Sequence, residues 1–287
     1  MYDELRHLML IVEHGTFTEA ARQAHLSQPA LSASIRRLED EMGARLLDRG
    51  RGGARLTAAG RALLPRARAS LAAFDDARRA VAEVAGLHAG EVRLGAGTTA
   101  TTYLLPPVLA RYRQRHPEIR YLLREVAVFE AHDALERGEL DLAVVTDNGD
   151  EPWFTDELIL VSAPHTERPP AGELGPIVTL RPGTTTRTLL DRHFPGADIV
   201  MELGSLSAVK GNVRAGIGTA LISRHAVVDD LRGKRLVRVR HPGTPIRRPL
   251  MLAHRGVDHL SPAVAALREL LLSPEGTRHL RRRRRPR

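Results

Sequence analysis

The sequence contains no cysteine, no long apolar run and few aromatic residues, and each absence excludes a class of protein. Without cysteine, the chain forms no disulfide, no thiolate metal site and no cysteine nucleophile. No segment approaches the roughly 18 apolar residues that a membrane helix requires. The first residues lack the basic flank and the apolar stretch of a signal peptide. We therefore expect a cytoplasmic protein with no membrane partner.

What is present is enough apolar sequence for two or three domains. The 287 residues are 43% hydrophobic but only 3% aromatic, so the cores must consist mostly of Ala, Leu and Val. The formal net charge is +9, yet lysine occurs only at Lys210 and Lys234, and the last ten residues hold seven arginines and no acid. Residues 281–287 are therefore expected to be a basic, solvated tail. The net charge alone does not indicate DNA binding.

The motifs of common enzymes are missing. The sequence has no His-Glu-x-x-His, no Gly-x-x-x-x-Gly-Lys-Ser/Thr and no Gly-x-Ser-x-Gly. The 13 histidines are scattered without the spacing of metal ligands. We therefore expect no catalytic residue, no metal, no cofactor and no enzymatic activity.

The first 58 residues have the pattern of a winged helix-turn-helix domain. Apolar residues at helical spacing predict a first helix that stops at His14. Thr18 is expected to cap a short second helix that ends at Ala24. Ser27 is expected to cap a third helix that ends at Gly43. This order is typical of a helix-turn-helix motif, with an ordinary small helical bundle as the alternative.

A wing and a linker helix are expected to follow. Residues 46–57 have apolar ends around a tip rich in glycine and arginine, which predicts a β-hairpin. Thr57 is expected to cap a long helix that starts at Ala58, bends at Pro65 and ends near residue 85. Its apolar residues are three or four positions apart, as in a coiled coil, which favours dimerisation over packing on its own domain. We assign residues 59–89 to this dimerisation helix and its flexible end.

From residue 90 onward, short strands and helices alternate, which predicts α/β sheets. Strands are expected at 91–95, 121–126, 140–145, 158–162, 177–179, 199–202, 219–222, 236–238 and 250–253. Helices are expected at 102–115, 131–137 and 262–272, with others between the later strands.

A threonine cluster lies between the first of these strands and its helix, and it predicts a binding site. Hydroxyls and free N–H groups at a helix N-terminus favour an anion, and a simple cap would use only one threonine. A second helix start after a strand would add similar donors, and the apolar pair that follows the strand at 121–126 would form a wall. We expect a small organic anion, a carboxylate with an apolar portion. The candidate effector residues are Thr98, Thr99, Thr101, Thr102, Val128, Phe129, Thr146, Gly204 and Ser205.

These motifs together resemble those of the LysR-type transcriptional regulators. The resemblance is carried by Phe17-Thr18-x-Ala-Ala-Arg22, Leu26-Ser27-Gln28-Pro29-Ala30-Leu31-Ser32, Gly43-x-x-Leu46-Leu47 and Leu56-Thr57-x-Ala-Gly60. Downstream it continues in Leu105-Pro106, His116-Pro117, Gly138-Glu139-Leu140-Asp141-Leu142-Ala143 and Val213-x-Ala-Gly216-x-Gly218.

The resemblance implies an α/β protein with a winged helix-turn-helix, a linker-helix dimer and a two-lobed effector domain like periplasmic binding proteins. The effector domain would span residues 90–280. One lobe would comprise about 90–161 and 258–280 and the other about 162–257, with hinge strands near Val161 and Val257. The implied partners are double-stranded promoter DNA at a partly palindromic site, a second copy or three further copies of the chain, and RNA polymerase. The protein would then be associated with the nucleoid.

The resemblance also implies which side chains face DNA. Gln28, Pro29, Ser32 and Arg36 on the recognition helix would do so, with the wing arginines on the minor groove or the phosphates. The full set of DNA-binding candidates is Thr18, Ser27, Gln28, Pro29, Ser32, Arg36, Arg37, Arg49, Arg51 and Arg55. The family often has Arg-Gln where this chain has Ala33-Ser34, which removes a contact. The alternatives are a small-molecule-binding module whose helical head serves only dimerisation and, less favoured, an enzyme with a regulatory head.

Overall fold

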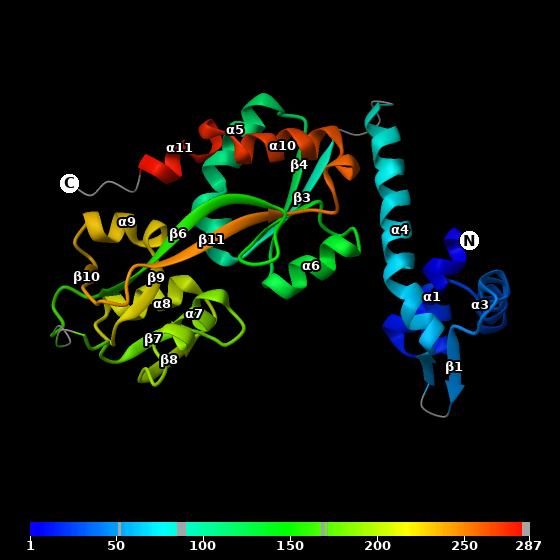
Figure 1. The fold of residues 1–287 in the computed structure, drawn as a ribbon, viewed down its shortest axis with the longest axis horizontal. Coiled ribbons are helices and arrows are strands. Elements are labelled where there is room, and N and C mark those ends of the chain that lie inside the picture. Colours follow the sequence, from blue (N-terminus) through cyan, green and yellow to red (C-terminus); the bar gives the residue numbers. More distant parts are fainter. Residues whose placement is uncertain (51–52, 85–89, 168–169, 171, 283–287) are drawn as a thin grey trace. The chain divides into compact units, whose positions relative to one another are not determined.

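The computed structural model describes residues 1–50, 53–84, 90–167, 170 and 172–282. They form two compact units, one around the N-terminal 88 residues and one around the remainder of the chain (Figure 1). We call them the N-terminal unit and the C-terminal unit and describe each separately.

The N-terminal unit is a three-helix domain with a hairpin and a long helix. Its elements are α1 (Tyr2–His14), α2 (Phe17–Gln23), α3 (Gln28–Met42), β1 (Leu47–Gly50), β2 (Gly53–Leu56) and α4 (Ala58–Val84). Leu8, Ile11 and Leu31 are fully buried in its core, together with Ile35 and Leu38.

Short polar residues define where these helices begin. Thr16, and not Thr18, caps α2 by accepting a hydrogen bond from the N–H of Glu19, so the helix starts earlier than predicted and Thr18 is an exposed residue inside it. The Ser27 hydroxyl accepts from the N–H of Ala30 at 3.3 Å and caps α3 as predicted. Gly43, with φ 65°, ends α3 in the left-handed conformation.

The two ends of α4 have different surroundings. The Thr57 hydroxyl accepts from the N–H of Gly60 at 3.0 Å at its start, and the helix continues through Pro65. Ala67 is 1% exposed and packs on the core of the N-terminal unit. Further along, Phe74 is 49% exposed and Val81 is 69% exposed. The first half of α4 is thus part of its own domain, whereas the second half leaves apolar side chains uncovered.

The C-terminal unit contains a seven-stranded mixed sheet and a two-stranded sheet, with helices packed on both. Its elements are β3 (Glu91–Ala96), the π-helix η1 (Ala100–Leu104), α5 (Pro106–Arg115), β4 (Arg120–Glu125), α6 (Val128–Glu136), β5 (Leu142–Val145), β6 (Glu151–Ser162), β7 (Ile177–Leu180), α7 (Thr185–His193), β8 (Ile199–Leu203), α8 (Leu206–Arg214), β9 (Ala220–Ser223), α9 (Arg224–Arg232), β10 (Val237–Val239), β11 (Ile246–Ala253), the 3-10 turn η2 (Val257–His259), α10 (Pro262–Leu272) and α11 (Pro274–Arg282). The large sheet has the order β10-β6-β11-β5-β3-β4, with β9 also paired to β6. The small sheet pairs β7 with β8 in parallel.

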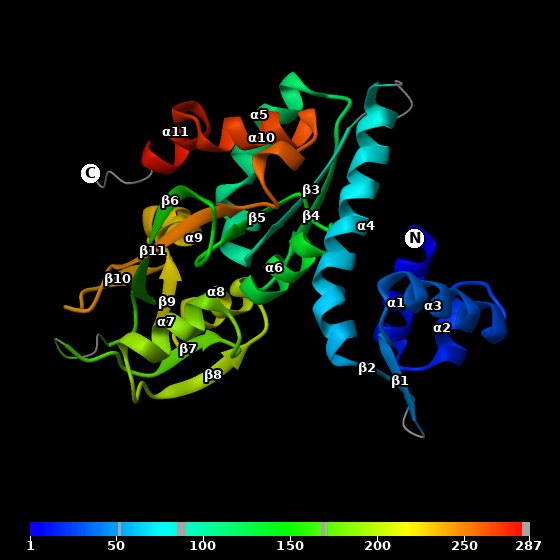
Figure 2. The same ribbon diagram turned by 45° about the vertical axis from the view of Figure 1, so that its right-hand side comes forward.

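Two long antiparallel strands, β6 and β11, run through both lobes of the C-terminal unit (Figures 1 and 2). On β6, Trp153 packs in the core of the first lobe, and Leu158 packs in that of the second. On β11, Leu250 belongs to the first core and Ile246 to the second. The chain therefore passes from one core to the other within these two strands.

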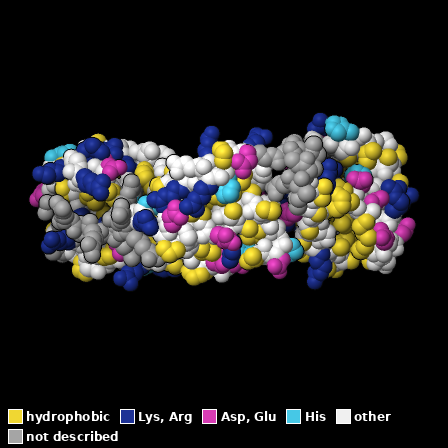
Figure 3. Space-filling view, turned by 90° about the horizontal axis from the view of Figure 1, so that it is seen from above, with side chains coloured by type: hydrophobic (Ala, Val, Ile, Leu, Met, Phe, Trp, Pro, Cys, Tyr) yellow, Lys and Arg dark blue, Asp and Glu magenta, His cyan; other side chains and the backbone are white. Residues whose placement is uncertain are grey.

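The remaining sequence predictions concern the surface and the chain end. None of the described helices is long and apolar enough to cross a membrane. Basic and acidic side chains are interspersed on the face shown in Figure 3. The final helix α11 extends to Arg282, so the predicted tail begins as helix, and residues 283–287 lie outside the described part of the chain.

Candidate functional site

Helix α3 presents a polar face to solvent. Leu31, Ile35 and Leu38 are buried in the core. Four candidates are exposed, Gln28, Pro29, Arg36 and Arg37, while Ser32 is half-buried. The Arg37 Nε donates to Glu4 Oε1 at 3.2 Å, so this arginine is held against α1. Gln28 and Pro29 are exposed in the first turn of α3, the part of a recognition helix that reads base edges, and Arg36 is exposed about two turns further along.

The Ala33-Ser34 pair differs from the family pattern, and the two residues lie in different surroundings. Ala33 is exposed, but Ser34 is only 2% exposed, and its Oγ lies 2.7 Å from Nδ1 of His7 on α1. Burial lowers the pKa of His7. Ser34 therefore belongs to the contact between α1 and α3 and is not available to DNA.

The predicted wing is formed by β1 and β2, which pair in antiparallel register. Its position is fixed by a hydrogen bond from the Ala54 N–H to the Gly15 carbonyl, at 2.8 Å. Arg55 is exposed on this hairpin. The side chain of Arg49 and all of Arg51 fall outside the described residues.

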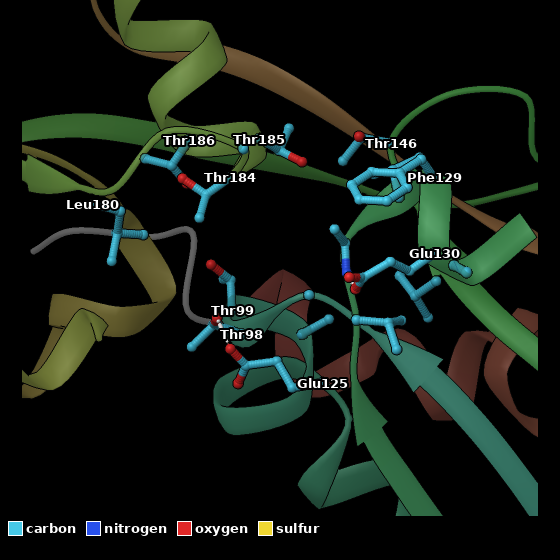
Figure 4. A pocket seen from close by; sticks show the side chains of 18 of the residues that line it. Thr98, Thr99, Glu125, Phe129, Glu130, Thr146, Leu180, Thr184, Thr185 and Thr186 are labelled. Carbon is cyan, nitrogen blue, oxygen red and sulfur yellow. Dashed lines mark hydrogen bonds between the residues drawn. The ribbon is translucent and has the colours of Figure 1, made fainter. Parts of the chain in front are cut away.

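A cavity of about 320 Å³ lies between the two lobes of the C-terminal unit (Figure 4). The first lobe contributes the segments that follow β3, β4 and β5. The second lobe contributes the connection from β7 to α7, and β11 contributes two residues. The residues that line the cavity include Thr98, Thr99, Glu125, Val128, Phe129, Glu130, Thr146, Arg181, Thr184, Thr185, Thr186 and Arg248.

Five of the predicted effector residues line this cavity. The Thr98 hydroxyl donates to Glu125 Oε1 at 2.5 Å. No hydrogen bond to the hydroxyls of Thr99 or Thr146 is found within the described part of the chain, so both are available to a ligand. Val128 is half-buried, and the 72% exposed Phe129 points along the wall of the cavity in Figure 4. The cavity thus combines hydroxyl groups with an apolar surface.

The other four predicted residues do not line this cavity. After Thr99 the chain forms a π-helix, in which the Thr101 hydroxyl donates to the Thr98 carbonyl at 3.0 Å instead of pointing into the cavity. Thr102 is exposed and does not line it. Ser205 caps α8 by accepting from the N–H of Ala208 at 3.2 Å, and neither it nor Gly204 lines the cavity.

The second lobe instead provides the first turn of α7, which the sequence predictions missed. The Thr184 hydroxyl accepts from the N–H of Arg187 at 3.3 Å and caps the helix. The N–H groups of Thr185 and Thr186 lie in the first turn, where no acceptor exists within the helix. The positive end of the helix dipole adds to their attraction for an anion. The sequence carries the signal, because residues 184–186 are a threonine-rich segment between a strand and a helix, as at Thr98.

Four charged residues of the cavity were also missed, namely Glu125, Glu130, Arg181 and Arg248. Glu125 is the last residue of strand β4, and Glu130 accepts from the N–H of Ala127 at 2.9 Å at the start of α6. Arg248 is almost fully buried on β11 and forms an ion pair with Asp156 on β6. Nothing in the local sequence indicated that Arg248 would face a cavity.

The helix-turn-helix geometry and the two-lobed cavity agree with comparisons to known proteins. A family model for the bacterial regulatory helix-turn-helix protein of the lysR family matches residues 2–61. A model for the LysR substrate binding domain matches residues 85–273. The chain belongs to the LysR family. It is a DNA-binding transcriptional regulator with an effector-binding domain, and it is not an enzyme.

Individual LysR-type proteins match along most of this chain. The RuBisCO operon transcriptional regulator of Allochromatium vinosum is 30% identical, covering 97% of each chain. The uncharacterized HTH-type transcriptional regulator YeiE of Escherichia coli strain K12 is 32% identical, covering 92% of this chain and 95% of its own. The solved structure of full-length LysG from Corynebacterium glutamicum with bound effector Arg has a TM-score of 0.65 at 20% identity, over 95% of this chain and 96% of that one. These relationships decide against a binding module whose helical head serves only dimerisation.

Proposed function

We propose that this LysR-type regulator binds a small organic anion between the lobes of its effector domain. The observation that carries the proposal is that two groups of hydrogen-bond donors face one another across the cavity in Figure 4. One group is the hydroxyl of Thr99, since that of Thr98 already donates to Glu125, and the other is the first turn of α7. Both groups suit an anionic head, while Val128 and Phe129 suit an apolar remainder. A carboxylate with an apolar portion satisfies both requirements.

The same proposal explains how the ligand would regulate DNA binding. A ligand shifts a conformational equilibrium only if it binds one arrangement more tightly than another. An anion that contacts Thr99 in one lobe and Thr185 in the other favours the closed arrangement, because only closure brings both donor groups to it. We also propose that the protein contacts RNA polymerase and that it is located in the cytoplasm, associated with the nucleoid.

Replacing Thr99 by valine tests the anion site without changing the size of the side chain. We expect the Thr99→Val variant to bind its best carboxylate roughly 10-fold or more weakly, because a hydrogen bond to a charged group contributes about 1.5–3 kcal/mol. The measurement is calorimetric titration of wild type and variant with a panel of small acids. Thr102→Val is the matched control, because Thr102 is exposed outside the cavity. Equal affinity in wild type and Thr99→Val would contradict the assignment.

We further propose that the protein binds a partly palindromic promoter site as a dimer. A two-fold dimer presents two recognition helices to two half-sites, and homodimers are the commonest oligomers. The exposed apolar side chains Phe74 and Val81 on α4 support a dimer contact along that helix. The exposed start of α3 supports base reading by Gln28, whose amide suits bidentate contact with adenine.

Removing the Gln28 amide should therefore reduce specificity more than overall DNA affinity. We expect Gln28→Ala to weaken binding to the promoter site by roughly 1–3 kcal/mol while changing the affinity for random DNA little. Gel-shift titration with the DNA upstream of the chain's own gene and with a scrambled duplex measures both values. Gln114→Ala, on the exposed surface of the C-terminal unit, is the control. Equal losses on the two duplexes would exclude a base-reading role.

A further inference from the structure

A buried ion pair joins the two strands at the point where they pass from one lobe to the other. Asp156 on β6 and Arg248 on β11 are opposite one another in the antiparallel register, and their Nη2–Oδ2 distance is 2.5 Å. The exposed fractions of their side chains are 0% and 6%. Burying an ion pair costs desolvation free energy that an apolar pair of the same size avoids. The pair therefore suggests a role other than stability.

The two partners differ in how completely they are hydrogen-bonded. Asp156 also accepts at Oδ1 from the Ser223 hydroxyl at 2.8 Å and from the Glu157 N–H at 2.9 Å. Arg248 has one further contact, from Nη1 to the Thr186 hydroxyl at 3.3 Å. Its Nε is buried and has no acceptor among the described residues. A buried donor without an acceptor is uncommon in folded proteins and calls for an explanation.

The position of Arg248 supplies that explanation. Arg248 is one of the residues that line the cavity, and its contact residue Thr186 belongs to the first turn of α7, which lines it as well. The guanidinium group thus lies beside the helix N-terminus at which an anion is expected. Asp156 balances its formal charge, and its remaining N–H donors add to the partial positive charge of the helix end.

We propose that Arg248 is the residue that selects an anionic effector and that its Nε–H donates to the effector when the lobes close. This inference rests on the proposed anion site and adds the residue that distinguishes an anion from a neutral analogue. Because Arg248 and Asp156 lie in the two strands that connect the lobes, a ligand held by Arg248 also acts on the joint between them. The ligand class is a carboxylate or another oxyanion, and a neutral amide of the same shape lacks the charge that Arg248 recognises.

The test compares carboxylates with their amides. Benzoate, hexanoate and succinate are titrated against the full-length protein, together with benzamide, hexanamide and succinamide. The variant is Asp156→Asn with Arg248→Met, which removes both charges, leaves no buried carboxylate without its partner and keeps an acceptor for Ser223. The control is Glu157→Gln with Arg224→Met, which removes an adjacent ion pair outside the cavity.

For the best-bound acid, we expect wild type and the control to prefer the carboxylate over its amide by about 10- to 100-fold, the factor that a charge-assisted hydrogen bond contributes. The Asp156→Asn, Arg248→Met variant should bind both compounds with affinities within about 3-fold of each other. A second readout uses nuclear magnetic resonance of the arginine Nε–H groups. The resonance that is absent in Arg248→Lys should move on addition of the carboxylate to wild type.

The outcomes separate this inference from the proposed function. If the double variant keeps the preference for the carboxylate, or if the Arg248 resonance does not move when a carboxylate binds, Arg248 does not select the anion although the anion site stands. If none of the acids binds wild type, the proposed anion site fails and this inference fails with it. If the double variant does not fold, the shift of the Arg248 resonance in wild type decides in the same way.

Discussion

Asp230→Ala is expected to lower the free energy of unfolding of the C-terminal unit by about 3 kcal/mol, because removing one partner from a buried charge network leaves the other without compensation. Asp230 is 1% exposed and pairs with three cations, two of them on α8 and one just after α9. Lys210 Nζ lies 3.0 Å from its carboxylate, Arg235 Nε lies 2.9 Å away and Arg214 Nη2 lies 2.5 Å away. Of the three, Lys210 is the most buried and would lose the most. Urea denaturation followed by circular dichroism measures the change.

The network also makes the stability depend on pH. Burial raises the pKa of Asp230, but hydrogen bonds from Lys210 and Arg235 outweigh it, so its pKa is lowered. A lowered pKa in the folded state means that the stabilisation is complete above the ordinary aspartate pKa of about 3.9 and is lost as the pH falls below it. Wild type should therefore lose more stability than Asp230→Ala below that pH. The control is Asp229→Ala, because Asp229 is exposed and its ion pair with the exposed Arg232 is long at 3.7 Å. An equal effect at the two positions would contradict the network's role.

Gly60→Ala is expected to destabilise the N-terminal unit by about 3 kcal/mol, at the upper end of what overpacking costs. Gly60 lies in the first turn of α4, against the segment that leads into the wing. An added Cβ would overlap the Leu46 carbonyl oxygen and lie 2.8 Å from Leu56 Cδ2. The carbonyl is main chain and accepts from the N–H of Thr57 at 3.0 Å, so it cannot move away freely. The midpoint temperature of thermal unfolding and the affinity for the promoter site should both decrease.

The same substitution at another helical glycine should have the opposite sign. Gly211 lies inside α8, and nothing lies within 4 Å of an added Cβ. Alanine is favoured over glycine in a helix by about 1 kcal/mol, so Gly211→Ala should stabilise the C-terminal unit. If both variants were destabilised alike, the close contact at Gly60 would not be the cause.

The sequence was sufficient wherever structure depends on neighbours along the chain. Ser27 and Thr57 begin helices because a hydroxyl three residues before an N–H can accept from it, and Gly43 ends one because it tolerates a positive φ. Thr18 and Thr16 have the same capping chemistry, and local patterns do not distinguish them. The sequence therefore predicts Thr18 as the cap, whereas Thr16 caps the helix. Of the threonine cluster, Thr98 and Thr99 line the cavity.

Predictions were incomplete wherever position depends on distant parts of the chain. The π-helix turns the Thr101 hydroxyl back onto the main chain, and no sequence pattern marks that change of helix type. From the sequence, the helix that begins opposite the threonine cluster could be α7 or α8. Only the topology of the second lobe brings Thr184 to the cavity and leaves Ser205 outside it. Arg248 and Asp156 are 92 residues apart and meet only because β6 and β11 are paired.

The position of the single tryptophan gives this protein an internal optical reporter. Trp153 is 7% exposed on β6, and its indole N–H donates to the Leu271 carbonyl at 3.1 Å. The N-terminal unit contains no tryptophan, so light absorbed selectively by indole reports on the C-terminal unit alone. Since Trp153 precedes Asp156 by three residues on a strand shared by both lobes, its emission should respond to movement at the joint as well as to unfolding. Titrations of effector and of denaturant can thus be followed by fluorescence in the unlabelled protein.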